Sequence, residues 1–318
     1  MLTVILSSRN GAAVLRQTLD GLVAMTTPAE RWKLVAVDNA SSDNTQEVLQ
    51  SYQDRLPITV LSEPAPGKNK AVNRALDHAE GDLYVFCDDD IIVAKDWLIK
   101  WREVADTHEE CDLFAASVLP CWPHDPPHWL SGDKNGHIFF STNEYMREGP
   151  CEATDMFGAN MAIRASVFAT GLRFNVGIGP DGSASYAMGS ETEFASRLAA
   201  LGYKCWFAPG PFVKHIIRAN QMRREWILGR GYRWGRGNAR MNLPHHYVPK
   251  KLSWKNFLRA NLYPILMPFM SEAEAWARHW EWAVDEGYED GYRAAHGLPP
   301  RWLKTGKSLY IAQRFRND

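Results

Sequence analysis

Three consecutive aspartates, Asp88, Asp89 and Asp90, are the residues of this 318-residue chain whose type and spacing point most directly to chemistry. They lie between two apolar runs, residues 83–87 and 91–93. Three carboxylates crowded between buried segments repel one another unless a cation neutralises them, and carboxylate oxygens suit Mg or Mn. A solvated turn is the alternative interpretation. We favour a divalent-cation site, because apolar runs enclose the triple on both sides.

Another acid, Asp38, follows a second apolar run at residues 34–37. In open parallel sheets, ligands bind beyond the carboxyl ends of the strands, so Asp38 and the aspartate triple fit one binding edge. An acid at the end of a second strand also suits a dinucleotide-dependent dehydrogenase. That alternative is disfavoured, because the turn at residues 7–13 lacks the glycine pattern that lets a backbone approach a pyrophosphate.

Two glutamates begin a segment with helical periodicity, and we expect them to have different roles. Ser190 and Glu193 have the spacing of a capping box, in which the serine caps the helix and the glutamate reaches back to it. Glu191 has no such structural explanation. The positive end of the helix favours its ionised form, which a general base needs. We therefore expect Glu191 to be the base and Glu193 to belong to the cap.

Short β-branched runs alternate with helix-period segments in the first third of the chain. The expected strands are residues 3–6, 34–37, 58–61 and 83–87. This alternation predicts an α/β fold with a doubly wound, mainly parallel sheet and helices on both faces. Farther along we expect a strand at 158–164 and a helix at 191–201. A C-terminal helical extension follows, with Trp276, Trp280 and Ala283 on one face.

The composition is that of an ordinary globular protein, with 45% hydrophobic residues, 23% charged residues and a net charge of -1. These values exclude a disordered or fibrous protein. Five cysteines without a C-x-x-C pair argue against a disulfide scaffold and a structural zinc site. No basic segment leads into a signal peptide, and the apolar stretch at 262–270 is too short to span a bilayer. We therefore expect a cytoplasmic protein, with peripheral membrane contact left open.

The chain resembles glycosyltransferase family 2, whose members have the GT-A fold. The resemblance rests on residues 4–10, 37–43, 67–73, 88–90 and 189–193, together with His215. It covers about residues 1–220 and implies a nucleotide-sugar-binding half at 1–120 and an acceptor and catalytic half at 121–220 of one GT-A domain. Residues 221–318 are then a basic and afterwards acidic helical extension.

The resemblance implies transfer of a sugar from a nucleoside diphosphate donor, here a UDP-sugar, to an acceptor hydroxyl. By that resemblance Asp38 binds the base, Asp88 the ribose, and Asp90 a Mn or Mg ion on the diphosphate. The histidine, His215, is the second candidate metal ligand and shifts the preference toward Mn. The other expected donor contacts are Ser7, Arg9, Lys68 and Asp89, and the expected acceptor or sugar contacts are Asn160, Trp122 and Trp129.

The expected reaction is a single, inverting displacement in glycan or glycolipid assembly, with Glu191 as the base. Residues 221–226 have one residue more than the Gln-x-x-Arg-Trp pattern of processive synthases, which favours single addition. The acceptor is a glycan, a lipid-linked sugar or a small molecule. Two other classes stay open, namely a metal-dependent phosphohydrolase of nucleotide sugars and a non-catalytic nucleotide-sugar binding module.

A basic stretch lies between residues 212 and 259, where twelve Lys and Arg residues face a single acid, Glu225. Arginines alternate there with aromatic residues. This pattern is compatible with closure over the donor diphosphate, with contact between residues 218–259 and an anionic membrane, or with nucleic acid. We favour the first two alternatives over nucleic acid as a partner.

Overall fold

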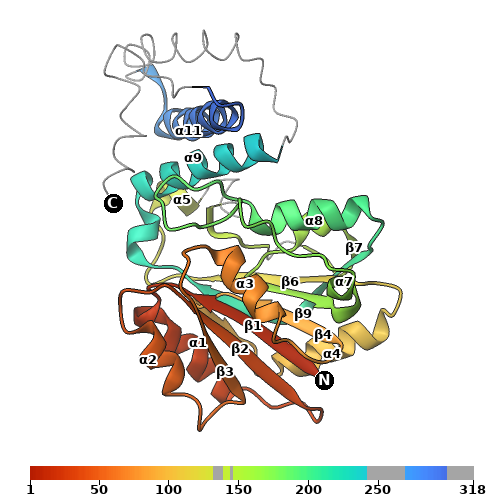
Figure 1. Ribbon diagram of the computed structural model, residues 1–318. Helices are drawn as coiled ribbons and strands as arrows, with labels where there is room; N and C mark the ends of the chain where they lie inside the picture. Colours follow the sequence, from red (N-terminus) through yellow and green to blue (C-terminus); the bar gives the residue numbers. More distant parts are fainter. Residues whose placement is uncertain (132–138, 144–145, 242–268, 299–318) are drawn as a thin grey trace. The chain divides into compact units, whose positions relative to one another are not determined.

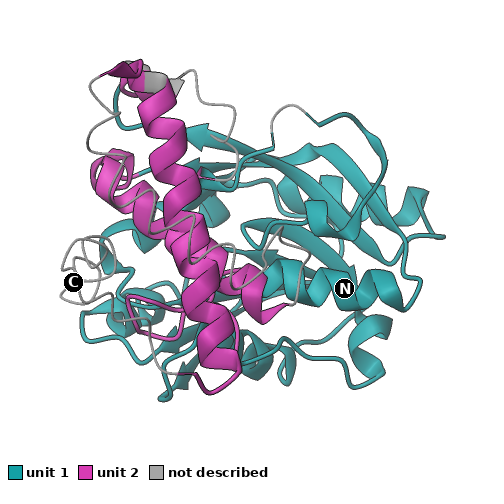
Figure 2. Cartoon of the chain, turned by 90° about the horizontal axis from the view of Figure 1, so that it is seen from above, with its two compact units in different colours: residues 1–124, 140–176, 190–217 teal, residues 125–139, 177–189, 218–318 magenta. Residues whose placement is uncertain are grey.

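The computed structural model describes residues 1–131, 139–143, 146–241 and 269–298 (Figure 1). The chain divides into two compact units (Figure 2). Unit 1 consists of residues 1–124, 140–176 and 190–217, and unit 2 consists of residues 125–139, 177–189 and 218–318. Unit 2 therefore contains the expected C-terminal extension together with two segments of the expected 121–220 half.

Unit 1 contains a mixed sheet with the strand order β3-β2-β1-β4-β8-β6-β9-β5, in which β7 also pairs with β9. The strands are β1 (Leu2–Ser8), β2 (Trp32–Asn39), β3 (Ile58–Glu63), β4 (Leu83–Cys87), β5 (Ile91–Val93), β6 (Leu113–Cys121), β7 (Gly149–Cys151), β8 (Asn160–Arg164) and β9 (Cys205–Ile216). Their pairings give β1, β2, β3, β4, β6 and β9 one direction and β5, β7 and β8 the opposite direction. The expected mainly parallel sheet is confirmed.

The parallel register of β1, β2 and β4 brings their carboxyl ends to one edge of the sheet. Ser8 lies beside Asp38, and Leu6 lies beside Cys87, the residue before Asp88. All five residues of β4 are buried, as expected for a central strand that is covered on both faces. The chain segments that leave these strands therefore meet at the same edge.

Helices cover both faces of this sheet (Figure 1). On one face lie α1 (Ala12–Ala24), α2 (Thr45–Gln50) and α4 (Trp97–Thr107), and on the other lie α3 (Lys68–Leu76), α7 (Ala165–Ala169) and α8 (Ser190–Ala200). Within β1, Val4 and Leu6 belong to the first core and Ile5 to the second, because successive strand residues point to opposite faces. The expected helices on both faces are confirmed.

Helix α2 ends at Gln50, and beyond it the Tyr52 hydroxyl donates a hydrogen bond to Asp20 at 2.9 Å. β9 was not expected as a strand, because Pro209, Gly210 and Pro211 interrupt its pattern. A register shift in its pairing with β6 accommodates this interruption.

Unit 2 contains a pair of closely packed helices, α9 (Arg224–Arg240) and α11 (Glu272–Ala295), with the shorter α5 (His128–Ser131) and η2 (Ala219–Met222). A side chain at Gly235 or Gly287 would overlap the backbone of the facing helix. The expected apolar face of the C-terminal helix is confirmed, because Trp276, Trp280 and Ala283 are buried. No helix in the described ranges is long and apolar enough to cross a membrane.

Candidate active site

The carboxyl edge of the sheet in unit 1 joins three elements through the ammonium group of Lys68. Lys68 begins α3, Asp88 follows β4, and Glu191 lies in the first turn of α8. The Lys68 Nζ atom lies 2.8 Å from Asp88 Oδ1 and 2.9 Å from Glu191 Oε1. The structure thereby brings together the expected ribose ligand, an expected donor contact and the expected base.

The start of α3 is fixed by the side chain of Asn39 at the end of β2. The backbone N–H of Gly67 donates to Asn39 Oδ1 at 2.8 Å. Asn39 Nδ2 donates to the backbone oxygens of Glu63 at 3.2 Å and Ala65 at 2.9 Å. Gly67 has a φ of 150°, a conformation that glycine adopts without strain. This loop holds Lys68 at the edge where the strands end.

The charge of Lys68 is stabilised by its two carboxylate partners. Burial lowers the pKa of Lys68, but the negative charges of Asp88 and Glu191 and their hydrogen bonds outweigh burial and raise this pKa well above its usual value. Lys68 therefore stays positively charged at neutral pH. Its side chain as a whole retains 24% exposure.

Glu191 is held at the start of α8 in a different way from the one expected. Ser190 is the first residue of the helix, and its buried hydroxyl has no hydrogen-bond partner among the described residues. Glu193 instead forms an ion pair with Arg197 at 2.9 Å. The expected capping box of Ser190 and Glu193 is therefore wrong, because the side chain of Glu193 turns along the helix toward Arg197.

Gly158 is a feature of the site that the sequence analysis missed. It lies between η1 (Ala153–Asp155) and β8, where a Cβ atom would overlap the carboxylate of Glu191. Only a residue without a side chain leaves room for that carboxylate. No sequence motif marks this glycine, because the constraint comes from a helix that begins about thirty residues later.

A cleft with about 290 Å³ of empty space, counting the part open to solvent, lies at these residues. Its polar lining includes Ser7, Lys68, Asp88 and Glu191, and Gly158 forms part of the wall. Apolar side chains from both sides of the site complete it, namely Ile5, Val72, Phe86, Met161 and Phe174. The expected donor contact Ser7 therefore shares a cleft with the expected base.

Asp90 and His215 form a second polar pair at the end of the β5–β9 pairing. Asp90 Oδ2 lies 3.5 Å from His215 Nε2, and both side chains are nearly buried. His215 Nδ1 lies 2.7 Å from the backbone oxygen of Phe140. A carbonyl oxygen only accepts hydrogen bonds, so Nδ1 carries a proton and Nε2 faces the carboxylate. Burial lowers the pKa of His215, but the Asp90 carboxylate and the charge of Asp88 outweigh burial and raise it.

This pair fits a divalent cation by its donor set. A carboxylate and an imidazole whose other nitrogen donates to a carbonyl oxygen are typical ligands, and Mn accepts both oxygen and nitrogen. Among the described residues, no three His, Cys, Asp or Glu side chains gather into a complete metal site. Two protein ligands agree with an ion whose remaining positions are taken by phosphate oxygens and water.

Asp38 lies at the same edge with an unsatisfied acceptor. The residue is 5% exposed, and its Oδ1 atom is buried without a hydrogen-bond partner in the described ranges. A buried acceptor that lacks a partner is costly. Such groups are kept where a ligand supplies the missing donor, so Asp38 is suited to accept an N–H from a ligand.

The middle aspartate of the triple is tied to the protein. The hydroxyl of Ser8 donates to the carboxylate of Asp89, and a Cβ atom at Gly11 would overlap that carboxylate. The hydroxyl of Thr18 donates to the backbone oxygen of Asp89 at 2.9 Å. These contacts place Asp89 against the start of α1. Arg9, another expected donor contact, is exposed just beyond β1.

Asn160 is a core residue in the structure. It has no exposed surface, and Trp97 Nε1 donates to its Oδ1 at 3.0 Å. Its Nδ2 donates to the backbone oxygens of Ser117 at 3.0 Å and Pro211 at 2.7 Å. The expectation of an acceptor contact at Asn160 is therefore wrong, because the polar atoms of this amide are used within the fold.

The two tryptophans expected near the acceptor belong to different units. Trp122 follows β6 in unit 1 and packs edge-on against Phe140, with ring centroids 5.1 Å apart. Because the Phe140 backbone oxygen faces His215, Trp122 lies close to the Asp90–His215 pair. Trp129 packs against Trp276 at 4.7 Å within unit 2, where it contributes to an aromatic cluster.

Within unit 2, several arginines of the basic stretch contact aromatic rings or an acid. Guanidinium groups lie over aromatic rings in the pairs Arg224–Trp129, Arg230–Trp226, Arg233–Tyr186 and Arg236–Tyr232. Arg224 also forms an ion pair with Glu272. Among the arginines at 223–240, Arg223 and Arg240 are exposed. Residues 242–259 of the stretch lie outside the described residues, and membrane contact stays a prediction.

Comparisons with known proteins agree with the architecture. The family described as Glycosyl transferase family 2 matches residues 3–172, just over half of the chain. ExoM of Rhizobium meliloti, a succinoglycan biosynthesis protein, is 28% identical over 236 residues, which cover 71% of each chain. Validoxylamine A glucosyltransferase of Streptomyces hygroscopicus subsp. jinggangensis is 31% identical over 132 residues, which cover 40% of this chain and 31% of that protein.

Solved structures with the same fold include two transferases. The mannosyltransferase PcManGT of Pyrobaculum calidifontis, in complex with GDP-Man and Mn2+, has a TM-score of 0.58 at 20% identity, covering 99% of this chain and 82% of that one. Residues 1–349 of TarS from S. aureus, in complex with UDP-GlcNAc, have a TM-score of 0.51 at 14% identity, covering 96% and 95%.

Proposed function

Because the chain belongs to glycosyl transferase family 2, we propose that it is a metal-dependent, inverting glycosyltransferase that adds a single sugar from a UDP-sugar to an acceptor hydroxyl. The proposed setting is polysaccharide or glycolipid assembly. The similarity to ExoM, which is named for succinoglycan biosynthesis, supports that setting. The structures with UDP-GlcNAc and GDP-Man support a nucleoside diphosphate donor.

The donor is proposed to bind across the carboxyl ends of β2 and β4. The partnerless oxygen of Asp38 accepts an N–H of the base, which a uracil ring presents at N3. Asp88 accepts a hydroxyl of the ribose. Lys68 uses two of its three N–H groups for carboxylates in the described structure, so the third is available to the diphosphate.

The pair of Asp90 and His215 is proposed to hold a Mn or Mg ion. When bound there, such an ion neutralises the charge that builds up on the departing diphosphate. The burial of both side chains suits this role, because electrostatic interactions are stronger where water is scarce.

Glu191 is proposed to take the proton from the acceptor hydroxyl. The acceptor oxygen forms a bond to the anomeric carbon from the face opposite the diphosphate, and the bond between that carbon and the phosphate oxygen breaks. Its electron pair leaves with the nucleoside diphosphate, and the proton stays on the Glu191 carboxylate. One displacement of this kind inverts the anomeric centre.

The observation that carries the proposal is the position of Glu191 beside Asp88. One ammonium group lies within 3 Å of both carboxylates, although the residues are far apart in the sequence. A base of a sugar transferase must lie beside the donor site, because the acceptor attacks a carbon of the bound donor. The arrangement therefore supports a transferase over a protein that only binds the nucleotide.

Replacing Glu191 by Gln tests this role, because Gln keeps the size and cannot take the proton. We expect transfer to fall by about 10²–10⁴-fold, the usual contribution of a positioned base. Donor affinity and melting temperature should stay near wild type. The assay follows labelled sugar transfer with donor and metal saturating.

Glu193→Gln is the matched control, since Glu193 belongs to the same helical turn and faces Arg197. It should keep most of the activity. An active Glu191→Gln with an inactive Glu193→Gln would reverse the assignment. Acceptor-independent release of phosphate would indicate a phosphohydrolase, and donor binding without any turnover would indicate a binding module.

A further inference from the structure

The carboxylate of Glu191 is enclosed by two features with different physical effects, a cation from α3 and a glycine before β8. We propose that Lys68 and Gly158 together position this carboxylate for the acceptor, Lys68 by attraction and Gly158 by leaving space. The inference rests on the proposed role of Glu191 as the base. Toward the acceptor, Lys68 and Gly158 are then positioning residues that act through Glu191, separately from the proposed contact of Lys68 with the diphosphate.

Lys68 provides the attraction from a fixed position. Its residue begins a helix whose preceding loop is held by three hydrogen bonds of the Asn39 side chain. Its ammonium group spans 2.8 Å to Asp88 and 2.9 Å to Glu191. A charged hydrogen bond at this distance restricts an otherwise flexible glutamate side chain. Glu191 is thereby kept close to Asp88.

Gly158 provides the space on another side of the same carboxylate. A Cβ atom at this position would lie 2.9 Å from Glu191 Cδ and would overlap Oε1. The φ of Gly158 lies outside the left-handed region, so the glycine is required for its size and not for its backbone conformation. The atoms that a methyl group would displace are the end of a flexible side chain. An alanine there should fold normally and move the base.

Gly158→Ala is therefore the sharpest test. We expect kcat to fall by about 10–100-fold, because small misplacement of a reacting group has effects of this size. The donor KM should change less than about twofold, since Glu191 does not hold the donor. The melting temperature should stay close to wild type. Gly210→Ala is the control, because its Cβ would meet only the Lys100 side chain, at an ordinary 3.6 Å.

Lys68→Met tests the attraction, with Lys68→Arg as the conservative variant. Methionine should lower kcat by about tenfold or more at saturating donor, and arginine should lose less, because it keeps a cation between the two carboxylates. Lys70→Met removes a charge from the same helix without touching Glu191 and should not produce this loss of kcat.

A double-mutant cycle separates positioning from direct contact with the diphosphate. If Lys68 acts through Glu191, Lys68→Met should cost less than about threefold when Glu191 is already Gln, because coupled residues are not additive. A full additional loss in that background would overturn the inference for Lys68. Wild-type kcat in Gly158→Ala would overturn it for Gly158.

The proposed function and the inference fail in different ways. If Glu191→Gln is active, Glu191 is not the base, and the inference fails together with the proposed function. An inactive Glu191→Gln, together with unchanged kcat in Gly158→Ala and in Lys68→Met, leaves the base in place and removes only the positioning roles.

Discussion

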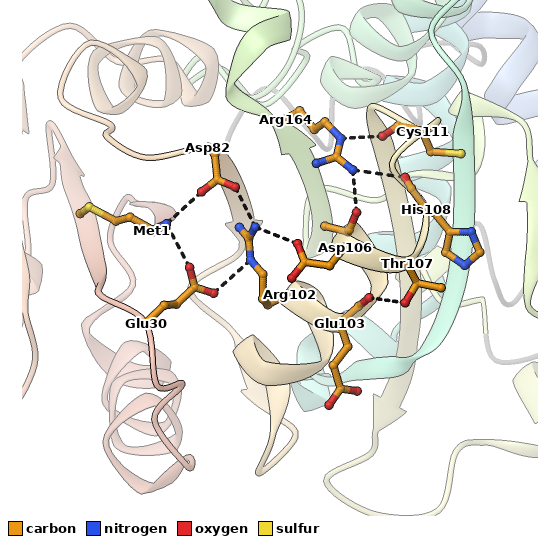
Figure 3. Close-up of polar contacts among 11 residues, drawn as sticks. Met1, Glu30, Asp82, Arg102, Glu103, Asp106, Thr107, His108, Cys111 and Arg164 are labelled. Carbon is orange, nitrogen blue, oxygen red and sulfur yellow. Dashed lines mark hydrogen bonds and ion pairs between the residues drawn. The ribbon is translucent and has the colours of Figure 1, made fainter.

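At the amino edge of the sheet in unit 1, a cluster of charged groups is matched within the chain (Figure 3). Arg102 of α4 forms ion pairs with Asp82 at 2.7 Å, Glu30 at 3.0 Å and Asp106 at 3.1 Å. The amino group of Met1 lies 3.0 Å from Glu30 and 2.9 Å from Asp82. Glu30 and Asp82 therefore each face two cations, Arg102 and the Met1 amino group.

At the carboxyl edge, the described polar contacts are distributed differently. Lys68 is shared between Asp88 and Glu191, and Asp38 has an oxygen without a partner in the described part of the chain. Asp90 Oδ2 lies 3.5 Å from the His215 imidazole. The Asp90–His215 pair and the partnerless oxygen of Asp38 suit a cation and a polar ligand.

Charged residues that cluster in a fold therefore differ in meaning. Those that pair with one another stabilise the fold, and a buried acceptor without a partner indicates a ligand site. Matched charges at the amino edge bind the starts of strands to α4. Arg164 reinforces this edge by donating to the backbone oxygens of Ala105 at 2.6 Å and Cys111 at 2.8 Å (Figure 3). At the carboxyl edge, the buried Asp38 oxygen without a described partner reduces stability, and a fold retains such a group where a ligand offsets the cost.

The largest effect should follow from Asp90→Asn at the carboxyl edge. An amide lacks the negative charge that a divalent cation requires, so Mn-dependent binding of UDP should weaken by about 100-fold or more. Calorimetry with UDP in the presence of Mn and in the presence of a chelator measures this difference. Unchanged Mn-dependent affinity would remove Asp90 from the proposed metal pair.

A smaller effect on binding should follow from Asp38→Asn. Loss of a charged hydrogen bond to the base should weaken donor binding by about 10–100-fold. The melting temperature without ligand should not fall, because the substitution removes a buried charge whose oxygen has no partner. A lower melting temperature with unchanged donor affinity would assign Asp38 to the amino-edge type of cluster, in which charge stabilises the fold.

The smallest effect on activity should follow from Arg102→Ala at the amino edge. The free energy of unfolding should fall by about 1–2 kcal/mol, between the values for exposed and buried ion pairs, since the Arg102 side chain is 20% exposed. Transfer activity should stay within about twofold of wild type, as for substitutions away from a site. Lys100→Ala, on the same helix and more exposed, should change stability by less than about 0.5 kcal/mol.

The difference in free energy of unfolding between wild type and Arg102→Ala should depend on pH. Burial raises the pKa of Asp82, but hydrogen bonds from Arg102 and the Met1 amino group outweigh burial and lower it below its ordinary value of 3.8. A lowered carboxyl pKa contributes stability above the unfolded pKa and loses it as the pH falls through the folded pKa. Denaturant unfolding of wild type and Arg102→Ala should therefore differ fully at neutral pH and less below about pH 3.8. An undiminished difference in acid would show that packing of Arg102 dominates.

The positions of the strands, and the carboxyl edge of the sheet as the place of the site, could be predicted from local sequence. Apolar runs before Asp38 and Asp88 predict strands of the kind that the structure contains. Since parallel strands end at one edge, the sequence also predicts that these acids lie near each other. The capping box of Ser190 and Glu193 fails because a competing partner, Arg197, lies one turn farther along the helix.

Residues without a local pattern could not be assigned in this way. Asn160 carries a polar side chain, which resembles a ligand contact in a sequence, and the fold surrounds it with Trp97 and two backbone oxygens. Trp129 belongs to an aromatic cluster with Trp276, almost 150 residues away in the chain. Burial and partners of this kind depend on which distant segments meet.

The sequence by itself determined the alternating elements, the acid near the end of β2, the acids directly after β4, and an acidic first turn in α8, because each depends on neighbours within a few residues. The tertiary structure alone decided that Lys68 meets Glu191, across 123 residues of sequence, and that Gly158 leaves space for its carboxylate. The physical reason is that an ion pair and a steric limit depend on distances of a few ångströms. Such distances between remote residues are set by the packing of the sheet and its helices, and no local pattern encodes them.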